Sequence, residues 1–299
     1  MSNAECVLEA KDWLGEAPCW HPREAALYWT DVPSKTLKRW YPATGEQTSW
    51  AMPEMVTAIA VRRSGGLIIA SRASIDFFDP RTGRATFFVA PEKDKPRNRS
   101  NDGKCDRQGR FWYGTMMNNF DRDMSELPIT ANTGGLYRID PDGAIHTFER
   151  NLGIANTFAW SPDDRKMYFA DTLDAIYAYD FDSASGNISN RRTFARTDAK
   201  QYGVPDGSTI DAQGFLWNAR WDGGCIIRWS PDGTIDKVVK MPCRRVTSCI
   251  FGGADLDVLY VTTVRYGLSA AELAEQPLAG GIFAIDTGVK GLPDGQFAG

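Results

Sequence analysis

Three residues that lie far apart in the sequence could together hold a metal ion. Glu16, Asn156 and Asp206 offer two carboxylates and one amide oxygen, with no sulfur and no imidazole among them. Hard oxygen donors of this kind suit Ca²⁺, Mg²⁺ or Mn²⁺ better than copper or iron–sulfur centres. Two carboxylates also balance the charge of one divalent ion. We therefore predict one divalent metal ion, with Ca²⁺ favoured, Mg²⁺ or Mn²⁺ as alternatives, and Zn²⁺ as a further candidate in vitro.

A repeat along the chain is what would bring these residues together. Each copy has a hairpin turn followed by an apolar or aromatic strand opening, and the copies are spaced by 40, 44, 56, 49 and 43 residues. The six openings are Ala26–Trp29, Gly66–Ile69, Arg110–Tyr113, Lys166–Phe169, Phe215–Asn218 and Val258–Val261. A second segment with period-two alternation follows each opening, which predicts a further strand. These segments are Leu37–Pro42, Ile75–Pro80, Leu136–Pro141, Ile176–Asp180, Ile226–Pro231 and Ile282–Asp286.

Six copies of about 50 residues, each with four short strands, predict an all-β fold. We expect residues 1–299 to form a single six-bladed β-propeller domain, with four-stranded antiparallel blades around a central channel. A pair of β-sandwich domains is the alternative, but sandwiches require no repeated sequence. Cys6–Asp12 is predicted to pair with the last blade as an outer strand and close the ring. Only Ser269–Glu275 has a plausible helical pattern.

The repeat also predicts which residues face the channel. In a propeller the first strand of each blade lines the channel, about 10 or 11 residues before the apolar pair of each strand opening. The residues found there are Glu16, Val56, Asn101, Asn156, Asp206 and Ser248. Gly15 and Pro18 flank Glu16, and Pro205 and Gly207 flank Asp206, which suggests strand starts with close backbone approach. The alternative is that these polar residues only solvate a water-filled channel.

Composition narrows the function further. The formal net charge of −4 argues against a nucleic-acid or anionic-membrane surface, and no apolar run approaches 18 residues. The first residues lack a basic region followed by an apolar stretch, and the six scattered cysteines form no CxxC motif, so we expect a cytoplasmic protein with reduced thiols. Two histidines exclude a multi-histidine metal site and disfavour a Ser-His-Asp triad. A monomer or weak dimer is expected.

The chain resembles the regucalcin (senescence marker protein), gluconolactonase and luciferin-regenerating enzyme family over nearly its full length. The segments that carry this resemblance are Leu14–Pro18, Arg99–Lys104, Gly114–Met116, Asn156 before Trp160-Ser161, Gly186–Arg192, Pro205–Gly207, Thr247–Gly253 and Ala279–Phe283. The resemblance implies a six-bladed propeller, one divalent cation in the channel mouth, and hydrolysis of sugar-acid lactones. It also implies that Glu16, Asn156 and Asp206 bind the metal, while Arg99 and Asn101 contact the substrate.

One departure from the family pattern concerns substrate choice. Animal members carry a pair of glutamates after Gly-Thr-Met, one of which touches the sugar, whereas this chain reads Met117-Asn118-Asn119. A contact from Asn119 would be neutral and able to donate hydrogen bonds. Residues 117–133 are also the longest insertion in the repeat, and we expect them to form a loop over the mouth that helps to choose the substrate.

These residues suggest a mechanism in which an activated water attacks a metal-polarised lactone carbonyl. Asp206 is the candidate general base as well as a ligand, and the alternative is that it only holds the metal. Arg99 can pair with a substrate oxygen in bidentate fashion, or it can form a surface salt bridge. Asp102 should turn away from the channel and make a structural hydrogen bond.

Other functions stay open at this point. A non-catalytic calcium-binding or regulatory protein is the main alternative to a lactonase. An interaction scaffold of the Trp-Asp repeat kind would need no converging carboxylates, and a hydrolase of aryl esters or phosphotriesters would favour an aromatic and apolar lining. The sugar is also open, since hexonolactones, pentonolactones and acidic or sulfonated variants all remain candidates.

Overall fold

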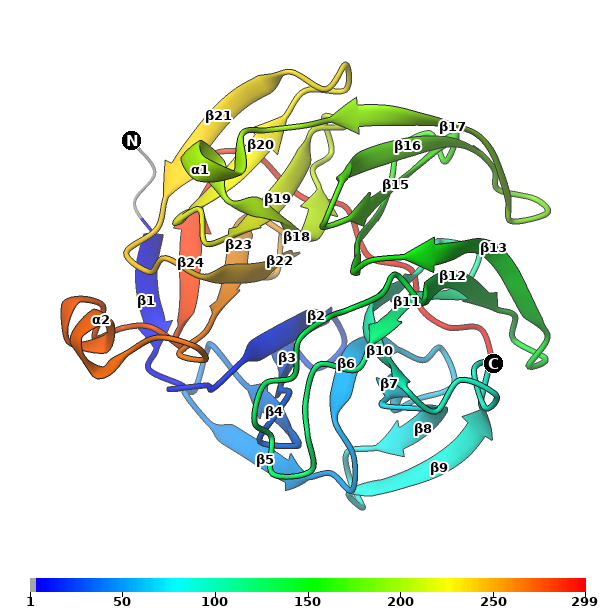
Figure 1. Ribbon diagram of the computed structural model, residues 1–299, viewed down its shortest axis with the longest axis horizontal. Helices are drawn as coiled ribbons and strands as arrows, with labels where there is room; N and C mark the ends of the chain where they lie inside the picture. The colour runs from blue at the N-terminus through cyan, green and yellow to red at the C-terminus, as the bar shows by residue number, and fades with distance from the viewer. Residues whose placement is uncertain (1–3) are drawn as a thin grey trace.

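The computed structural model describes residues 4–299, which form six four-stranded antiparallel sheets arranged in a ring (Figure 1). The predicted six-bladed propeller is therefore confirmed. We number the blades in chain order and give the strands of each blade from the inner to the outer one. Blade 1 consists of β2 (Gly15–His21), β3 (Ala26–Asp31), β4 (Thr36–Trp40) and β5 (Gln47–Ala51), and blade 2 consists of β6 (Val56–Val61), β7 (Leu67–Ser71), β8 (Ile75–Asp79) and β9 (Arg84–Val89). Blade 3 consists of β10 (Asn98–Cys105), β11 (Phe111–Met117), β12 (Gly134–Ile139) and β13 (Ile145–Leu152).

The remaining three blades follow the same order. Blade 4 consists of β14 (Ala155–Trp160), β15 (Lys166–Asp171), β16 (Ala175–Asp182) and β17 (Asn187–Ala195), and blade 5 consists of β18 (Val204–Ile210), β19 (Leu216–Trp221), β20 (Cys225–Trp229) and β21 (Ile235–Lys240). Blade 6 consists of β22 (Val246–Gly252), β23 (Val258–Thr263), β24 (Ile282–Asp286) and β1 (Ala4–Leu8). The repeated strand openings are thus the second strand of every blade. Each predicted alternating segment overlaps the third strand.

The outer strand of blade 6 comes from the N-terminal part of the chain. β1 pairs antiparallel with β24, with Ala4 opposite Ile285. This confirms the predicted closing strand, although it begins and ends earlier than Cys6–Asp12. The pairing covers the edge of β24, which would otherwise offer unpaired backbone groups to other chains.

The apolar core is divided among the contacts between neighbouring blades. A cluster of buried apolar side chains lies between each adjacent pair of blades around the ring. Trp112 of blade 3 meets Trp160 of blade 4 edge-on at 6.2 Å, and Trp217 of blade 5 meets Phe251 of blade 6 at 6.1 Å. Each blade buries its faces only against its neighbours, so the ring is stable as a whole rather than blade by blade.

Two short helices complete the described secondary structure. The predicted helical segment is confirmed as α2 (Ala270–Glu275), which Ser269 caps by accepting a hydrogen bond from the Glu272 backbone amide. A second helix, α1 (Ala199–Tyr202), was not predicted, although Asp198 caps it in a similar way. Among residues 4–299, no helix is long and apolar enough to cross a membrane.

Every inner strand is interrupted by a bulge near its beginning, at the mouth of the channel. The register between first and second strands shifts at this point in all six blades, for example between Glu16 and Cys19 and between Asn156 and Ala159. A bulge re-aims side chains and frees backbone groups from the ladder. The channel mouth is therefore lined by irregular backbone held on regular strands.

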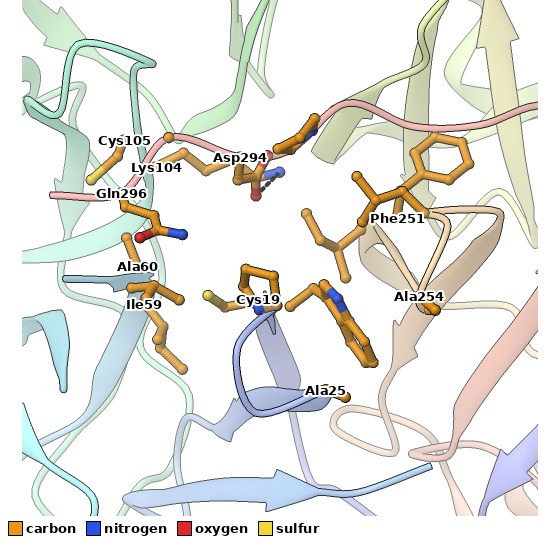
Figure 2. A pocket seen from close by; sticks show the side chains of 18 residues that line it. Cys19, Ala25, Ile59, Ala60, Lys104, Cys105, Phe251, Ala254, Asp294 and Gln296 are labelled. Carbon is orange, nitrogen blue, oxygen red and sulfur yellow. Dashed lines mark ion pairs between the residues drawn. The ribbon is translucent and has the colours of Figure 1, made fainter. Parts of the chain in front are cut away.

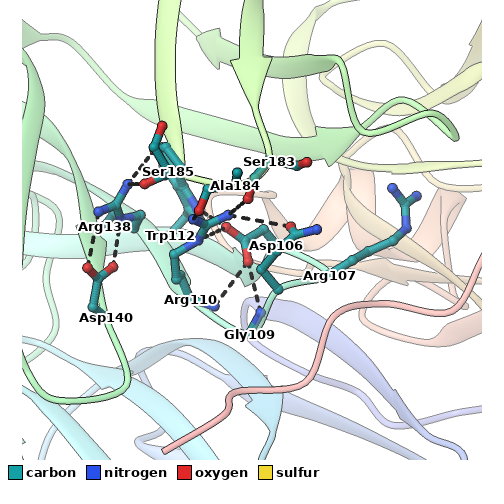
Figure 3. Close-up of polar contacts among 12 residues, drawn as sticks. Asp106, Arg107, Gly109, Arg110, Trp112, Arg138, Asp140, Ser183, Ala184 and Ser185 are labelled. Atoms are coloured by element: carbon teal, nitrogen blue, oxygen red, sulfur yellow. Dashed lines mark hydrogen bonds and ion pairs between the residues drawn. The ribbon is translucent and has the colours of Figure 1, made fainter.

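A buried aspartate ties the first hairpin of blade 3 together (Figure 3). Asp106 is fully buried, and it accepts hydrogen bonds from the amides of Gly109 and Arg110, from Arg110 Nε and from Trp112 Nε1. Arg110 in turn donates to the carbonyl of Ser183 in blade 4 at 2.8 Å. The carboxylate therefore fixes a turn, a tryptophan and a contact between two blades.

Blade 5 contains a similar arrangement. Asp211 accepts from Trp217 Nε1 at 2.9 Å and from Arg228 at 2.7 Å. Both aspartates lie six residues before the tryptophan they bind. This spacing is visible in the sequence and marks a structural carboxylate rather than a catalytic one.

We predict that Asp106→Ala destabilises the protein by about 3–5 kcal/mol, because it leaves the buried Arg110 and Trp112 donors unpaired. Urea unfolding followed by tryptophan fluorescence measures the change. Asp255→Ala is the control, since Asp255 forms an exposed ion pair with Lys290 and should cost at most about 1 kcal/mol. Equal effects of the two substitutions would contradict the structural role of Asp106.

Candidate metal and substrate site

The six residues predicted to bind the metal or the substrate all line one cavity of about 270 Å³ at the mouth of the channel, whereas Val56 and Ser248, also predicted to face the channel, are not part of its lining. Glu16 comes from blade 1, Asn156 from blade 4 and Asp206 from blade 5, on the inner strands β2, β14 and β18. Arg99 and Asn101 come from β10 of blade 3, and Asn119 comes from the loop after β11. The ring thus gathers side chains that are up to 190 residues apart in the chain.

The backbone next to two of these residues is strained. Ala17 and Thr157, which directly follow Glu16 and Asn156, have φ of 51° and 58°. Left-handed backbone is costly for residues other than glycine, and most of all for a β-branched residue. Thr157 is held there by hydrogen bonds from its hydroxyl group to the Asp206 carbonyl at 2.6 Å and with Ser208 Oγ at 2.9 Å. Strain maintained at two equivalent positions is typical of a functional site.

The bulges also bring to the channel mouth residues that differ in how they pair with the second strand of their blade. Glu16 and Asn156 are each the last residue to pair with the second strand before the register shift. Asp206 and Asn101 lie one residue further along, inside the shift. The four side chains therefore reach one cavity although they are not strictly equivalent in the repeat.

Hydrogen bonds orient the amide of Asn156. Its Nδ2 donates to Thr172 Oγ1 at 2.8 Å, and Thr172 donates onward to the Pro205 carbonyl at 2.8 Å. Its Oδ1 accepts from Asn101 Nδ2 at 3.1 Å. The amide oxygen therefore faces the cavity, as a metal ligand requires.

Arg99 joins the remaining predicted residues into one network. Its Nε donates to Asn119 Oδ1 at 2.9 Å, and its Nη1 donates to Asn101 Oδ1 at 2.8 Å. The side chain is buried, so the surface salt bridge considered for it is not what the structure shows. Asn101 connects this guanidinium to Asn156, which links the predicted substrate residues to the predicted metal ligands.

The two carboxylates share a buried environment with little compensation. Burial, together with the charge of Asp102, raises the pKa of Glu16 to about 8. Burial and the charges of Glu16 and Asp102 raise the pKa of Asp206 far above its ordinary range. Asp102 does not line the cavity and accepts from the Gly103 amide at 2.7 Å, which agrees with the structural role expected for it.

These residues fit a divalent cation bound through oxygen. No three His, Cys, Asp or Glu side chains within residues 4–299 gather as a metal site would require, so a cation here would have to be held by the two carboxylates, the Asn156 amide and water. A cation between Glu16 and Asp206 would remove their repulsion and allow both to ionise. The cavity lining offers no thiolate and no imidazole, which softer metals prefer, and its one sulfur is the thioether of Met116.

Other lining residues could not be identified from the repeat. The apolar residues that line the cavity are Leu14, Val32, Met116, Ile129, Ile154, Leu173, Val204 and Trp221. Glu126 and Tyr266 also line the cavity, from the loop after β11 and the segment after β23. The insertion at 117–133 was a sequence signal for Glu126. No comparable signal marked Tyr266.

A larger cavity of about 470 Å³ lies at the opposite end of the channel, where the inner strands end (Figure 2). It is lined mainly by apolar side chains, and its charged groups are Lys104 and Asp294, whose Nζ and Oδ2 are 3.6 Å apart. The chain after β24 crosses this end, and Phe297 donates its backbone amide to the Val61 carbonyl at 2.8 Å. With no converging carboxylates, this cavity lacks the chemistry of the mouth.

Comparison with known proteins identifies the family of the chain. Residues 14–265 match the SMP-30/Gluconolactonase/LRE-like region. The chain belongs to this family. Regucalcin of Oryctolagus cuniculus is 37% identical over 298 residues, which cover 99% of this chain and 98% of that protein.

Solved structures of family members share the fold. A regucalcin from Agrobacterium tumefaciens str. C58, described as a calcium-binding protein, is 28% identical with a TM-score of 0.91, covering 99% of this chain and 97% of that chain. A luciferin-regenerating enzyme is 31% identical with a TM-score of 0.91, covering 100% of both chains. The resemblance carried by the sequence motifs is thereby confirmed.

We predict that chelator-treated protein loses stability as the pH rises from about 4.5 to about 8. In that range the folded protein retains a proton on Glu16 that the unfolded chain has released, because the pKa of Glu16 is raised from 4.5 to about 8. Glu16→Gln removes this proton linkage, so its stability should exceed that of wild type at pH 9 by on the order of a few kcal/mol and match it near pH 4.5.

Urea unfolding with a chelator present, at pH 5, 7 and 9, measures this difference. Glu54→Gln is the matched control because Glu54 is exposed, and it should follow the wild-type curve. If Glu16→Gln and wild type show parallel pH profiles, the carboxyl of Glu16 is not buried beside like charges as described.

Proposed function

We propose that this protein is a metal-dependent hydrolase that opens sugar-acid lactones, with Ca²⁺ as the favoured ion. The observation that carries the proposal is the convergence of the buried Asp206 carboxylate, the half-buried Glu16 carboxylate and one amide oxygen beside a buried arginine network in one cavity. Membership of a family whose description includes gluconolactonase supports it. A cavity of about 270 Å³ is small for a ligand site and suits a single sugar ring rather than an oligosaccharide.

One divalent cation held by Glu16, Asn156 and Asp206 would supply Lewis acidity toward the lactone carbonyl. Asp206 accepts a proton from the attacking water while the oxygen of that water forms a bond to the carbonyl carbon. The bond between that carbon and the ring oxygen then breaks, and the ring oxygen takes up the proton that Asp206 had accepted, which leaves it as a hydroxyl group and regenerates the carboxylate. The product is the open hydroxy acid.

The remaining residues bind and orient the sugar. The Arg99 Nη2 group makes no hydrogen bond to the described chain, so it is available to a substrate oxygen. Asn119 fixes this guanidinium from the loop side and adds its own amide donors. The apolar side chains of the cavity lining, Trp221 among them, suit the C–H face of a sugar ring.

A calcium-binding protein without catalysis is the second candidate, favoured by the description of the Agrobacterium relative as a calcium-binding protein. Both functions use the same three ligands. They differ in whether a lactone is turned over.

We predict that metal-stripped protein hydrolyses aldonolactones only after Ca²⁺, Mg²⁺, Mn²⁺ or Zn²⁺ is added back, and that Asp206→Asn lowers kcat/KM by at least about 100-fold. Loss of a residue that merely supports a metal ligand already costs about 10- to 100-fold, and Asp206 is proposed as ligand and base. A pH-stat assay with each ion in turn measures turnover.

The control is Asp255→Asn, which removes an exposed carboxylate and should leave turnover unchanged. Cation binding without hydrolysis of any lactone in a panel of hexonolactones and pentonolactones would favour the non-catalytic function. Full activity of chelated protein would contradict the metal-dependent mechanism.

A further inference from the structure

Tyr266 forms a rigid part of the cavity wall. Its side chain is 7% exposed, and its ring packs edge-on against Phe120 at 5.4 Å and Trp13 at 6.2 Å. Its backbone amide donates to the Trp13 carbonyl at 2.8 Å, and its carbonyl accepts from Arg245. With the ring held on two sides and the backbone held at both groups, the position of the phenol oxygen is fixed.

That phenol oxygen is buried and makes no hydrogen bond of good geometry within residues 4–299, although the Glu126 carboxylate lies beside it. Leaving a buried hydroxyl unpaired costs about 1–3 kcal/mol, so native proteins rarely do so without a reason. Six buried side-chain atoms in the described chain lack a partner, and Tyr266 is the one residue among them that lines the cavity of the candidate site. A bound ligand is the natural partner for such a group.

Two charged groups flank the phenol. Arg99, which anchors the predicted substrate network, lies close enough for its charge to act on Tyr266, and so does Glu126 of the loop after β11. Burial and the Glu126 carboxylate raise the pKa of Tyr266, so the group stays protonated and can donate. Glu126 itself lies at the exposed rim of the cavity and can only accept when ionised.

The loop that carries Glu126 is fixed in place as well. Phe120 is buried against Val32 and Tyr266, and it forms an isolated antiparallel bridge with Glu126. The Leu127 amide donates to the Asn119 carbonyl at 2.8 Å. Residues 119–127 therefore form a small hairpin that presents Asn119 to Arg99 on one side and Glu126 to Tyr266 on the other.

We propose that Tyr266 and Glu126 form a specificity subsite that binds one hydroxyl group of the lactone, at the end of the sugar remote from the carbonyl. Tyr266 donates to the hydroxyl oxygen and Glu126 accepts its proton, a pairing that a hydroxyl satisfies in both directions. A carboxylate or sulfonate at the same position would meet the Glu126 charge and could donate nothing to it. The inference rests on the proposed lactonase function, and it narrows the substrates to neutral lactones with a free terminal hydroxyl.

Tyr266→Phe tests the subsite, because it removes one oxygen and keeps the ring. With a neutral hexonolactone, kcat/KM should fall about 5- to 10-fold, mostly through KM, as expected for the loss of one hydrogen bond. With the 6-deoxy analogue of the same lactone, wild type and Tyr266→Phe should be equal within about twofold. Glu126→Gln should narrow the preference of wild type for the neutral lactone over its 6-carboxylate.

Tyr260→Phe is the matched control, since Tyr260 is buried between blades 6 and 1 away from the cavity, and it should leave both lactones unaffected. Equal losses by Tyr266→Phe on the hydroxylated and the 6-deoxy lactone would overturn the subsite. So would an unchanged kcat/KM on both.

A binding experiment separates failure of the subsite from failure of the proposed function. Calorimetry with Ca²⁺-loaded protein measures the affinity for gluconate and for 6-deoxygluconate, which need no turnover. If wild type hydrolyses no lactone yet prefers gluconate in a manner lost in Tyr266→Phe, the subsite stands and catalysis does not. If turnover is found but wild type and Tyr266→Phe have the same kcat/KM and the same affinity, the subsite is wrong and catalysis stands.

Discussion

Burial of carboxylates, reinforced by repulsion between them, dominates the electrostatics of the channel mouth. Glu16 and Asp206 are brought together by a ring of blades that is stabilised elsewhere, and Asp102 adds a third negative charge nearby. Arg99 and Arg220 supply positive charge, but burial lowers the pKa of each to about 10, which shows that they too lack full solvation. A divalent cation is the simplest species that relieves this repulsion while leaving an open coordination position for a substrate.

The rest of the fold explains how such a costly arrangement persists. Six apolar clusters, one at each contact between blades, supply the burial energy, and aspartates such as Asp106 and Asp211 fix the hairpins at the other end of the inner strands. The mouth itself consists of bulges and left-handed residues that no regular strand would favour. The stabilising hairpins thus lie at one end of the inner strands and the strained candidate site lies at the other, as expected when strain is confined to a functional site.

The sequence was sufficient for the architecture because a propeller repeats its own pattern. Turn residues and alternating apolar side chains recur six times, so the position of Glu16 in one blade could be related to that of Asn156 in another. The repeat could not give the register, because a bulge shifts the pairing by one residue and leaves Asp206 and Asn101 one step beyond Glu16 and Asn156. It also missed α1, which is too short to show a helical period.

The predicted site residues do line one cavity, but the sequence identified only part of its lining, from the repeat and from the family resemblance. Trp221 is the last residue of β19 and Tyr266 follows β23, so neither occupies a channel-facing position of the repeat. Glu126 depends on how Phe120 anchors the inserted loop, which no local pattern specifies. Such contacts are long-range, so they follow from the folded ring and not from any window of sequence.

Calorimetric titration of Ca²⁺ into metal-free protein at pH 7, repeated in buffers with different ionisation enthalpies, tests the central claim most directly. Because the buried carboxyls hold protons in the metal-free state, the account predicts one bound ion per chain with net release of protons, and loss of both in Glu16→Gln. Binding without proton release, or binding that Glu16→Gln leaves unchanged, would contradict it.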